Sequence, residues 1–166
     1  MTTHDPRDDN REGARVPTST CRAAAVDYQT RLGWSVYALE STVWLTPGGR
    51  IEAFNVPREI GQRTMMALRA LDLSLPAINI PGPPDRWALL TRPHDGPVAD
   101  ILVLFAGARR GLCLHGPTQR PVLGLGYRPT PTRHPNREPL SWITPPETPL
   151  LPAILVAHII VAALTE

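Results

Sequence analysis

The stretch from Ile51 to Leu71, IEAFNVPREIGQRTMMALRAL, constrains the fold most because a strand pattern and a helix pattern meet at one proline. Pro57 has the backbone angle of a first helical turn, so we expect the strand to end there and a helix to begin. One apolar stripe then runs along the predicted helix, formed by Ile60, Thr64, Ala67, Leu68 and Leu71. Charged residues lie largely off this stripe, so the stripe should face a sheet.

Other local patterns predict further helices and strands. Thr20 is a plausible N-cap and Gly33 a plausible C-cap for a first helix. The segments 34–41 and 42–55 alternate apolar and polar residues around a Pro-Gly-Gly turn, which indicates strands joined by a hairpin. The segments 77–80 and 86–93 are two more predicted strands, separated by the turn PGPPD. This order of elements predicts an α+β fold in which helices pack on a mixed or antiparallel sheet.

The second half of the chain gives weaker signals. Residues 98–107 are too few for periodicity to separate helix from strand, and we favour a helix. Short strands are expected within 111–115, 121–126 and 141–144, and a proline-rich loop over 127–139. The apolar segment 150–166 predicts a terminal helix, either buried in the domain or forming an oligomer or partner interface. It is too short for a membrane span.

Composition bounds the domain organisation. We expect residues 1–18, which are polar and of mixed charge, to be a disordered tail, and residues 19–166 to form one domain. No signal peptide pattern is present, so we expect a cytoplasmic protein. Cys21 and Cys113 have no CxxC partner, which argues against a zinc cluster and favours free buried thiols.

All 17 basic residues are arginine. P-loop enzymes, Schiff-base enzymes and Ser-Lys hydrolases each need a lysine amine, so these classes are excluded. The bias towards Arg, Ala and Pro is typical of a GC-rich bacterial genome, so codon usage accounts for part of the arginine content.

Five segments appear in a familiar order across most of the chain. They are RLGWSVYAL (31–39), RIEAFNVP (50–57), INIPGPPDRWALLTRP (78–93), HGPTQRPVLGLGY (115–127) and LSWITPP (140–146). From about Arg22 to Leu164 the chain thus resembles the N-terminal domain of bifunctional DNA primase/polymerases, which belong to the archaeo-eukaryotic primase superfamily. The resemblance implies an RRM-like sheet core and a role in replication of a mobile element.

The residues at the family's catalytic motifs differ from the family pattern. In that family a D-x-D or D-x-E motif on a strand holds divalent metals, but here the positions are Ala53 and Asn55. Glu52 cannot replace them because neighbouring side chains point to opposite faces of a strand. The positions of the histidine motif hold Trp87 and Ala88, which cannot contact a triphosphate as imidazole does.

A third motif carboxylate is missing too, since no acidic residue lies between Asp100 and Glu138. Two-metal nucleotidyl transfer therefore lacks its ligands, and we expect no catalytic residues, no metal and no cofactor.

The same acid-free window could bind phosphate. It contains Arg109, Arg110, Arg120, Tyr127, Arg128, Arg133 and Arg137. Arginine suits phosphate, and Tyr127 could stack on a base. The competing interpretation is that these are solvated loop residues in a chain whose only basic residue is arginine.

Three functions follow as hypotheses. The leading one is a non-catalytic primase/polymerase-like domain that binds single-stranded nucleic acid or nucleotide as an accessory or regulatory module. The second is a protein-interaction or dimerisation module that uses the apolar helix Ile154–Leu164. The third is an active primase/polymerase with an unrecognised site.

Overall fold

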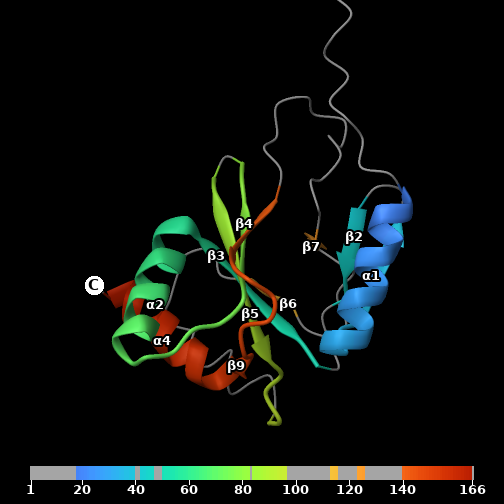
Figure 1. Ribbon diagram of the computed structural model, residues 1–166. Helices are drawn as coiled ribbons and strands as arrows, with labels where there is room; N and C mark the ends of the chain where they lie inside the picture. The colour runs from blue at the N-terminus through green and yellow to red at the C-terminus, as the bar shows by residue number, and fades with distance from the viewer. Residues whose placement is uncertain are drawn as a thin grey trace, which may run out of the picture.

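The computed structural model describes residues 18–39, 42–46, 50–82, 84–96, 113–115, 123–125 and 140–165, and Figure 1 shows their arrangement. The elements in chain order are α1 (Thr18–Leu32), β1 (Val36–Leu39), β2 (Thr42–Leu45), β3 (Glu52–Pro57), α2 (Arg58–Ala70), β4 (Ala77–Ile80), β5 (Arg86–Arg92), β6 (Cys113–His115), β7 (Leu123–Leu125), β8 (Ser141–Thr144), β9 (Leu151–Pro152) and α4 (Ala153–Thr165). The α+β class predicted from the sequence is confirmed.

The smaller sheet has the strand order β1-β2-β7 and is antiparallel. Helix α1 packs against β1 and β2. It begins two residues before the predicted N-cap Thr20 and ends at Leu32. The next residue, Gly33, has a φ of +65°, the left-handed conformation that glycine adopts readily.

The hairpin predicted around the Pro-Gly-Gly turn is wrong. β2 pairs with β1 and β7, whereas β3 pairs with β5 and β6 in the other sheet. An alternating pattern shows that a segment is a half-buried strand but does not identify its partner. β3 lies between β6 and β5 in the larger sheet, and its residues are buried on both faces.

The larger sheet has the strand order β6-β3-β5-β4-β8, with all these pairs antiparallel, and β9 pairs in parallel with β5. β3 and β4 are both antiparallel to β5, so they run parallel to each other with β5 between them. Because α2 connects β3 to β4, these elements form a split βαβ unit.

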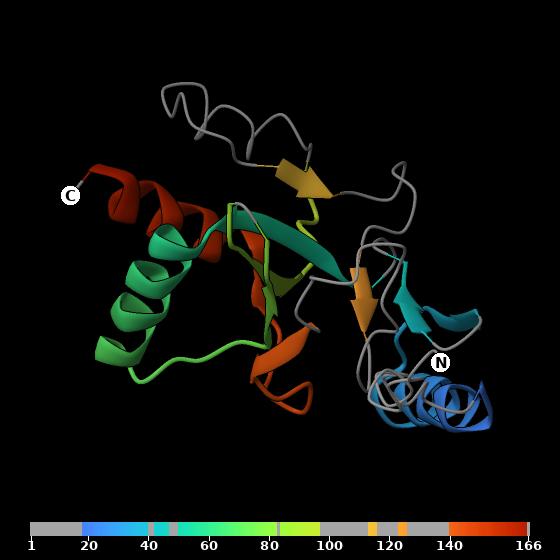
Figure 2. The same ribbon diagram turned by 90° about the horizontal axis from the view of Figure 1, so that it is seen from above.

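Helices and the smaller sheet cover the two faces of the larger sheet, so the molecule has three layers (Figures 1 and 2). One core lies between the sheet and α2 with α4, and includes Phe54, Leu68 and Ile160. The other core lies between the opposite face and α1 with the smaller sheet, and includes Ala53 and Trp34.

Helix α2 faces the sheet through part of the predicted stripe, since Thr64 and Leu68 are buried and Ile60 packs against the core. Its buried residues are Gly61, Thr64, Met65 and Leu68. Ala67 and Leu71, which were predicted to face the sheet, are exposed. Gly61 lies close to Trp87, since a Cβ added at Gly61 would lie 2.7 Å from Cε3 of Trp87. Because glycine has no side chain, α2 can approach β5 closely on this side of the helix.

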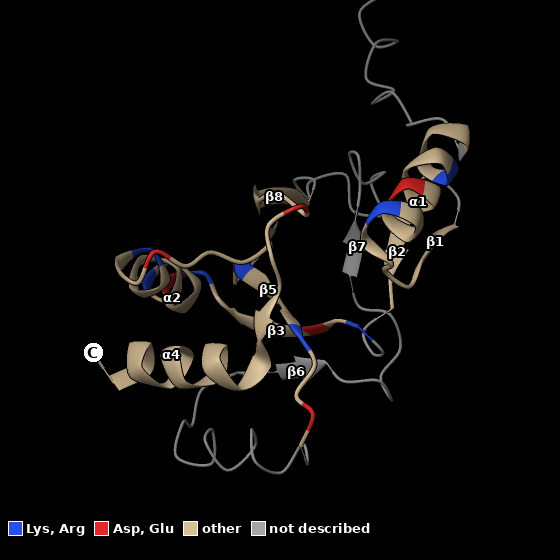
Figure 3. Ribbon diagram, turned by 60° about the horizontal axis from the view of Figure 1, so that its bottom comes forward, with Lys and Arg blue, Asp and Glu red and all other residues tan. Residues whose placement is uncertain are grey.

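The terminal helix α4 packs within its own chain, against α2 and the larger sheet. It carries no charged side chain, as Figure 3 shows. Five small or apolar residues are buried along it: Ala153, Val156, Ala157, Ile160 and Ala163. None of the described helices meets the length and apolarity that a membrane span requires.

Candidate functional site

The face of the larger sheet that lies towards α1 brings together three of the four predicted motif positions. Asn55 pairs with Ala88, Ala88 pairs with Ile78, and Ile78 pairs with Trp142. Residues paired across antiparallel strands share a face, so these four side chains form one row across the sheet. Ala53 lies two residues before Asn55 on β3 and shares this face.

Ala53 and Ala88 are part of the packed core on this face. Both are fully buried, and they share an apolar cluster with Ile78 and Leu90. A carboxylate or imidazole at either position would lose its hydration without gaining a partner. The two alanines therefore fit a packed interface between layers, with no ligand at these positions.

Trp87 lies on the opposite face of the sheet from Ala88, because the two are neighbours on β5. It packs against Gly61 of α2 and borders the core under that helix. The two positions at which the histidine motif was expected therefore point into different cores. Trp87 acts here as a packing residue.

Asn55 is half-buried and holds the guanidinium of Arg86. Nε of Arg86 donates to Oδ1 of Asn55 at 2.5 Å, and Nη2 donates to the backbone carbonyl of Asn55 at 2.6 Å. Arg86 lies two residues before Ala88 on β5 and so shares the face of Asn55. The structure thus places a permanent positive charge beside the position where the resemblance implied a metal-binding carboxylate.

The acidic residue next to Arg86 in the chain is already engaged elsewhere. Oδ1 of Asp85 accepts a hydrogen bond from the backbone N–H of Gly82 at 3.0 Å, and Oδ2 lies 3.3 Å from Nη1 of Arg58. The Gly82 hydrogen bond, followed by the Arg58 contact, lowers the pKa of the Asp85 carboxyl. Asp85 is therefore an ionised, paired surface group.

Glu52 is the one acidic residue on the described strands, and it is 5% exposed. It lies on the face opposite Ala53 and Asn55, as predicted. Burial raises the pKa of its carboxyl, although a backbone hydrogen bond and the charge of His94 act in the opposite direction. Oε2 of Glu52 is buried without a hydrogen-bond partner. Glu52 is therefore a buried carboxyl on the wrong face for a shared metal site.

The predicted phosphate-binding residues lie outside the described part of the chain. They are Arg109, Arg110, Arg120, Tyr127, Arg128, Arg133 and Arg137. The predicted helix over 98–107, the loop over 127–139 and tail residues 1–17 also fall outside it. Within the described ranges, no group of three or more His, Cys, Asp or Glu side chains could hold a metal ion.

Sequence reasoning missed Arg86. It lies 31 residues after Asn55 and begins a strand, so only the register of β3 against β5 brings the two together. A partial signal was present, since an arginine that alternates inward with two core residues of β5 has to find a polar partner.

Comparisons with known proteins gave no match. No protein-family model, no curated protein and no solved structure matches the chain.

Proposed function

We propose that this chain is a non-catalytic primase/polymerase-like domain that binds single-stranded nucleic acid or nucleotide. It would act as an accessory or regulatory module near the replication of a mobile element. The strand topology supports this proposal. A split βαβ unit in which β6 flanks β3 is consistent with the RRM-like core that the resemblance implies, and α1 leads into strand β1 before this unit, as in the start of the family that the sequence resembles.

The observation that carries the proposal is the contact between Arg86 and Asn55. A polymerase site needs carboxylates that hold two divalent cations. Here a neutral amide holds a guanidinium instead. A metal ion about 4 Å away would be repelled by about 4 kcal/mol for each pair of unit charges in a partly buried site. The site therefore favours an anion over a metal.

A fixed guanidinium can bind phosphate but cannot activate a nucleophile. Arginine keeps its charge at all physiological pH values, and its planar nitrogens match phosphate oxygens. Binding of this kind does not depend on sequence and weakens as salt rises. We therefore propose that Arg86 contacts one phosphate group. The proposed function includes no catalytic step.

The test compares two variants in titrations of fluorescent single-stranded DNA. Arg86→Gln removes the charge, and we expect affinity to fall about tenfold and the salt slope to decrease by about one. Asn55→Asp keeps the shape but neutralises Arg86, so we expect a similar loss. Arg69→Gln, on the exposed side of α2, is the matched control.

The Asn55→Asp variant also separates this proposal from an active enzyme. If the site is a damaged metal centre, the added carboxylate should increase manganese-dependent binding of a nucleoside triphosphate. If wild-type protein shows no salt-sensitive binding to single-stranded DNA or RNA at micromolar concentration, the proposed function is wrong.

A further inference from the structure

A pocket of about 650 Å³ lies between α1 and the segment that joins β8 to β9. This volume is in the range of small-ligand sites. Its lining comes from one side of α1 and from the residues after β8. The lining residues are Thr20, Ala23, Ala24, Asp27, Tyr28, Arg31, Trp142, Pro146 and Glu147.

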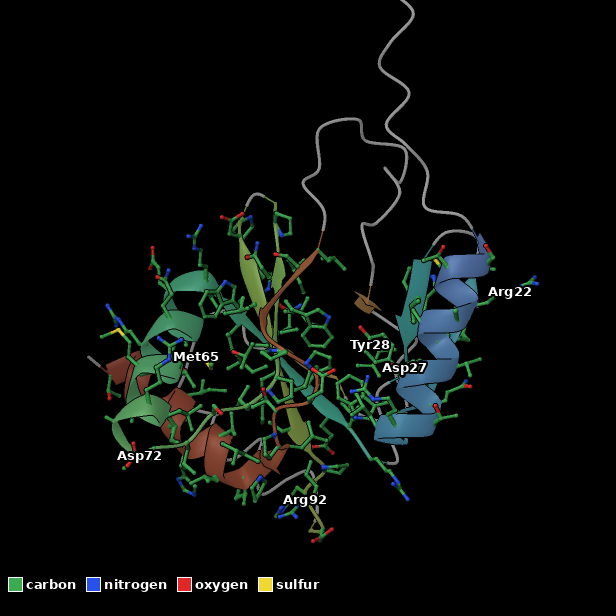
Figure 4. All side chains as sticks on the ribbon, in the orientation of Figure 1. Arg22, Asp27, Tyr28, Met65, Asp72 and Arg92 are labelled. Carbon is green, nitrogen blue, oxygen red and sulfur yellow. The ribbon has the colours of Figure 1, made fainter. Side chains whose placement is uncertain are left out.

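Aromatic rings form the rigid base of this pocket. Tyr28 extends from α1 towards the larger sheet, as Figure 4 shows. Nε1 of Trp142 donates a hydrogen bond to the Tyr28 hydroxyl at 3.3 Å. Trp34 stacks on Tyr28 with ring centroids 5.8 Å apart and lies 6.2 Å from the ring of Trp142. Tyr28 and Trp34 are buried, and both rings pack against the half-buried ring of Trp142.

Three charged side chains lie at the rim of the pocket. Nη1 of Arg31 lies 3.1 Å from Oδ2 of Asp27, and Nη2 lies 3.1 Å from Oε1 of Glu147. All three side chains are about half exposed. Asp27, and then the hydrogen bond to Glu147, raise the pKa of the Arg31 guanidinium. The rim thus has two carboxylates for one cation, so the charged lining is net negative.

This lining selects the charge of a ligand. A phosphate would meet two carboxylates and a single arginine that is already engaged, so an anion is disfavoured. A cation would meet two carboxylates and the aromatic side chain of Trp142, and aromatic rings attract cations. Ala23, Ala24 and Pro146 would contact an alkyl chain. Arg31 itself shows that a guanidinium fits between the two carboxylates.

We propose that this pocket binds an alkyl guanidinium or alkyl ammonium group, which displaces Arg31 from Asp27 and Glu147. Arg31 then acts as an internal competitor for the ligand. The group could belong to a free amine or to an arginine side chain of a peptide. This site is separate from the proposed phosphate contact at Arg86, and either can fail without the other.

The test titrates agmatine into the full chain in the absence of nucleic acid, by calorimetry and by thermal shift. Glu147→Gln removes a carboxylate, and we expect affinity to fall by about fivefold, the effect of losing one exposed ion pair. Arg31→Gln removes the competitor, and we expect affinity to rise by up to about fivefold, since an exposed ion pair stabilises only weakly. Arg22→Gln is the matched control, because Arg22 lies on the same helix but points away from the larger sheet (Figure 4).

The direction of the Arg31→Gln effect decides the proposal. Weaker agmatine binding in this variant, or no binding by wild type at millimolar agmatine, would overturn it. Binding of inorganic phosphate that Arg31→Gln abolishes would overturn it as well. A parallel titration with a capped Gly-Arg-Gly peptide separates the two sources. Tighter binding of the peptide than of agmatine assigns the site to a protein partner, and the reverse assigns it to a free amine. Circular dichroism checks that each variant is folded.

Discussion

At the scale of single residues, the buried carboxyl of Glu52 is the clearest source of pH dependence. Burial raises its pKa above the ordinary value of 4.5, so the folded state prefers the protonated form. The ionised carboxyl therefore destabilises the folded state. This destabilisation is absent below the pKa that Glu52 has in the unfolded chain, and it grows as pH rises from that pKa to the higher pKa of the folded state. At neutral pH the destabilisation is fully present.

We therefore expect Glu52→Gln to stabilise the fold at pH 7, because the neutral amide does not carry the desolvation penalty of a buried carboxylate. At about pH 3 the gain should disappear, since Glu52 is then protonated in both states. Urea unfolding at the two pH values measures the difference. A loss of stability at pH 7 would mean that the ionised carboxylate has a strong partner.

Replacing Gly61 by alanine should change the free energy of unfolding in the opposite direction from the same replacement at most helical glycines. Replacing a glycine inside a helix by alanine usually stabilises it by about 1 kcal/mol. At Gly61 the new Cβ would lie 2.7 Å from the ring of Trp87, which overpacks the core. We expect Gly61→Ala to destabilise the fold by about 1–3 kcal/mol in chemical unfolding. In a Trp87→Leu background the two closest ring contacts are removed, so the penalty should shrink, and a penalty of unchanged size would contradict the ring contact.

At the scale of elements, α4 is a structural part of the domain. Its buried stripe, which includes Val156 and Ile160, fills the core beside α2. We expect Ile160→Ala to cost about 2–5 kcal/mol, whereas His158→Ala, at an exposed position of the same helix, should be nearly neutral. Chemical unfolding measures both.

The mass in solution tests the alternative role of this helix. If Ile154–Leu164 were mainly a dimer surface, a chain trimmed before α4 would be a folded monomer. Because five residues of α4 are buried in their own chain, we expect trimming to abolish cooperative unfolding. A trimmed chain that stays folded at half the original mass would favour the dimerisation hypothesis.

At the scale of the whole molecule, the three layers leave no pair of carboxylates on one face of the described strands. We expect no primer synthesis with magnesium or manganese, labelled nucleotides and a single-stranded template. An active primase/polymerase from the family that the sequence resembles serves as the positive control. Robust product would show that the third hypothesis, an unrecognised catalytic site, is correct.

The sequence alone determined the local elements of this protein. The strands at 77–80, 86–92 and 141–144, the helix stop at Gly33 and the buried terminal helix were all predictable, because each depends on a pattern within a few residues. The opposite orientations of Glu52 and Ala53 followed from strand geometry in the same way.

Only the tertiary structure decided which elements meet. Four features depend on residues that are far apart in the chain. They are the partner of β2, the stripe of α2 that faces the sheet, the contact of Arg86 with Asn55 and the bridge of Arg31 to Glu147. Hydrophobic periodicity records whether a side chain is buried, and it carries no information on which surface buries it. Strand register and layer packing supply that information, because they minimise exposed apolar area over the whole chain at once.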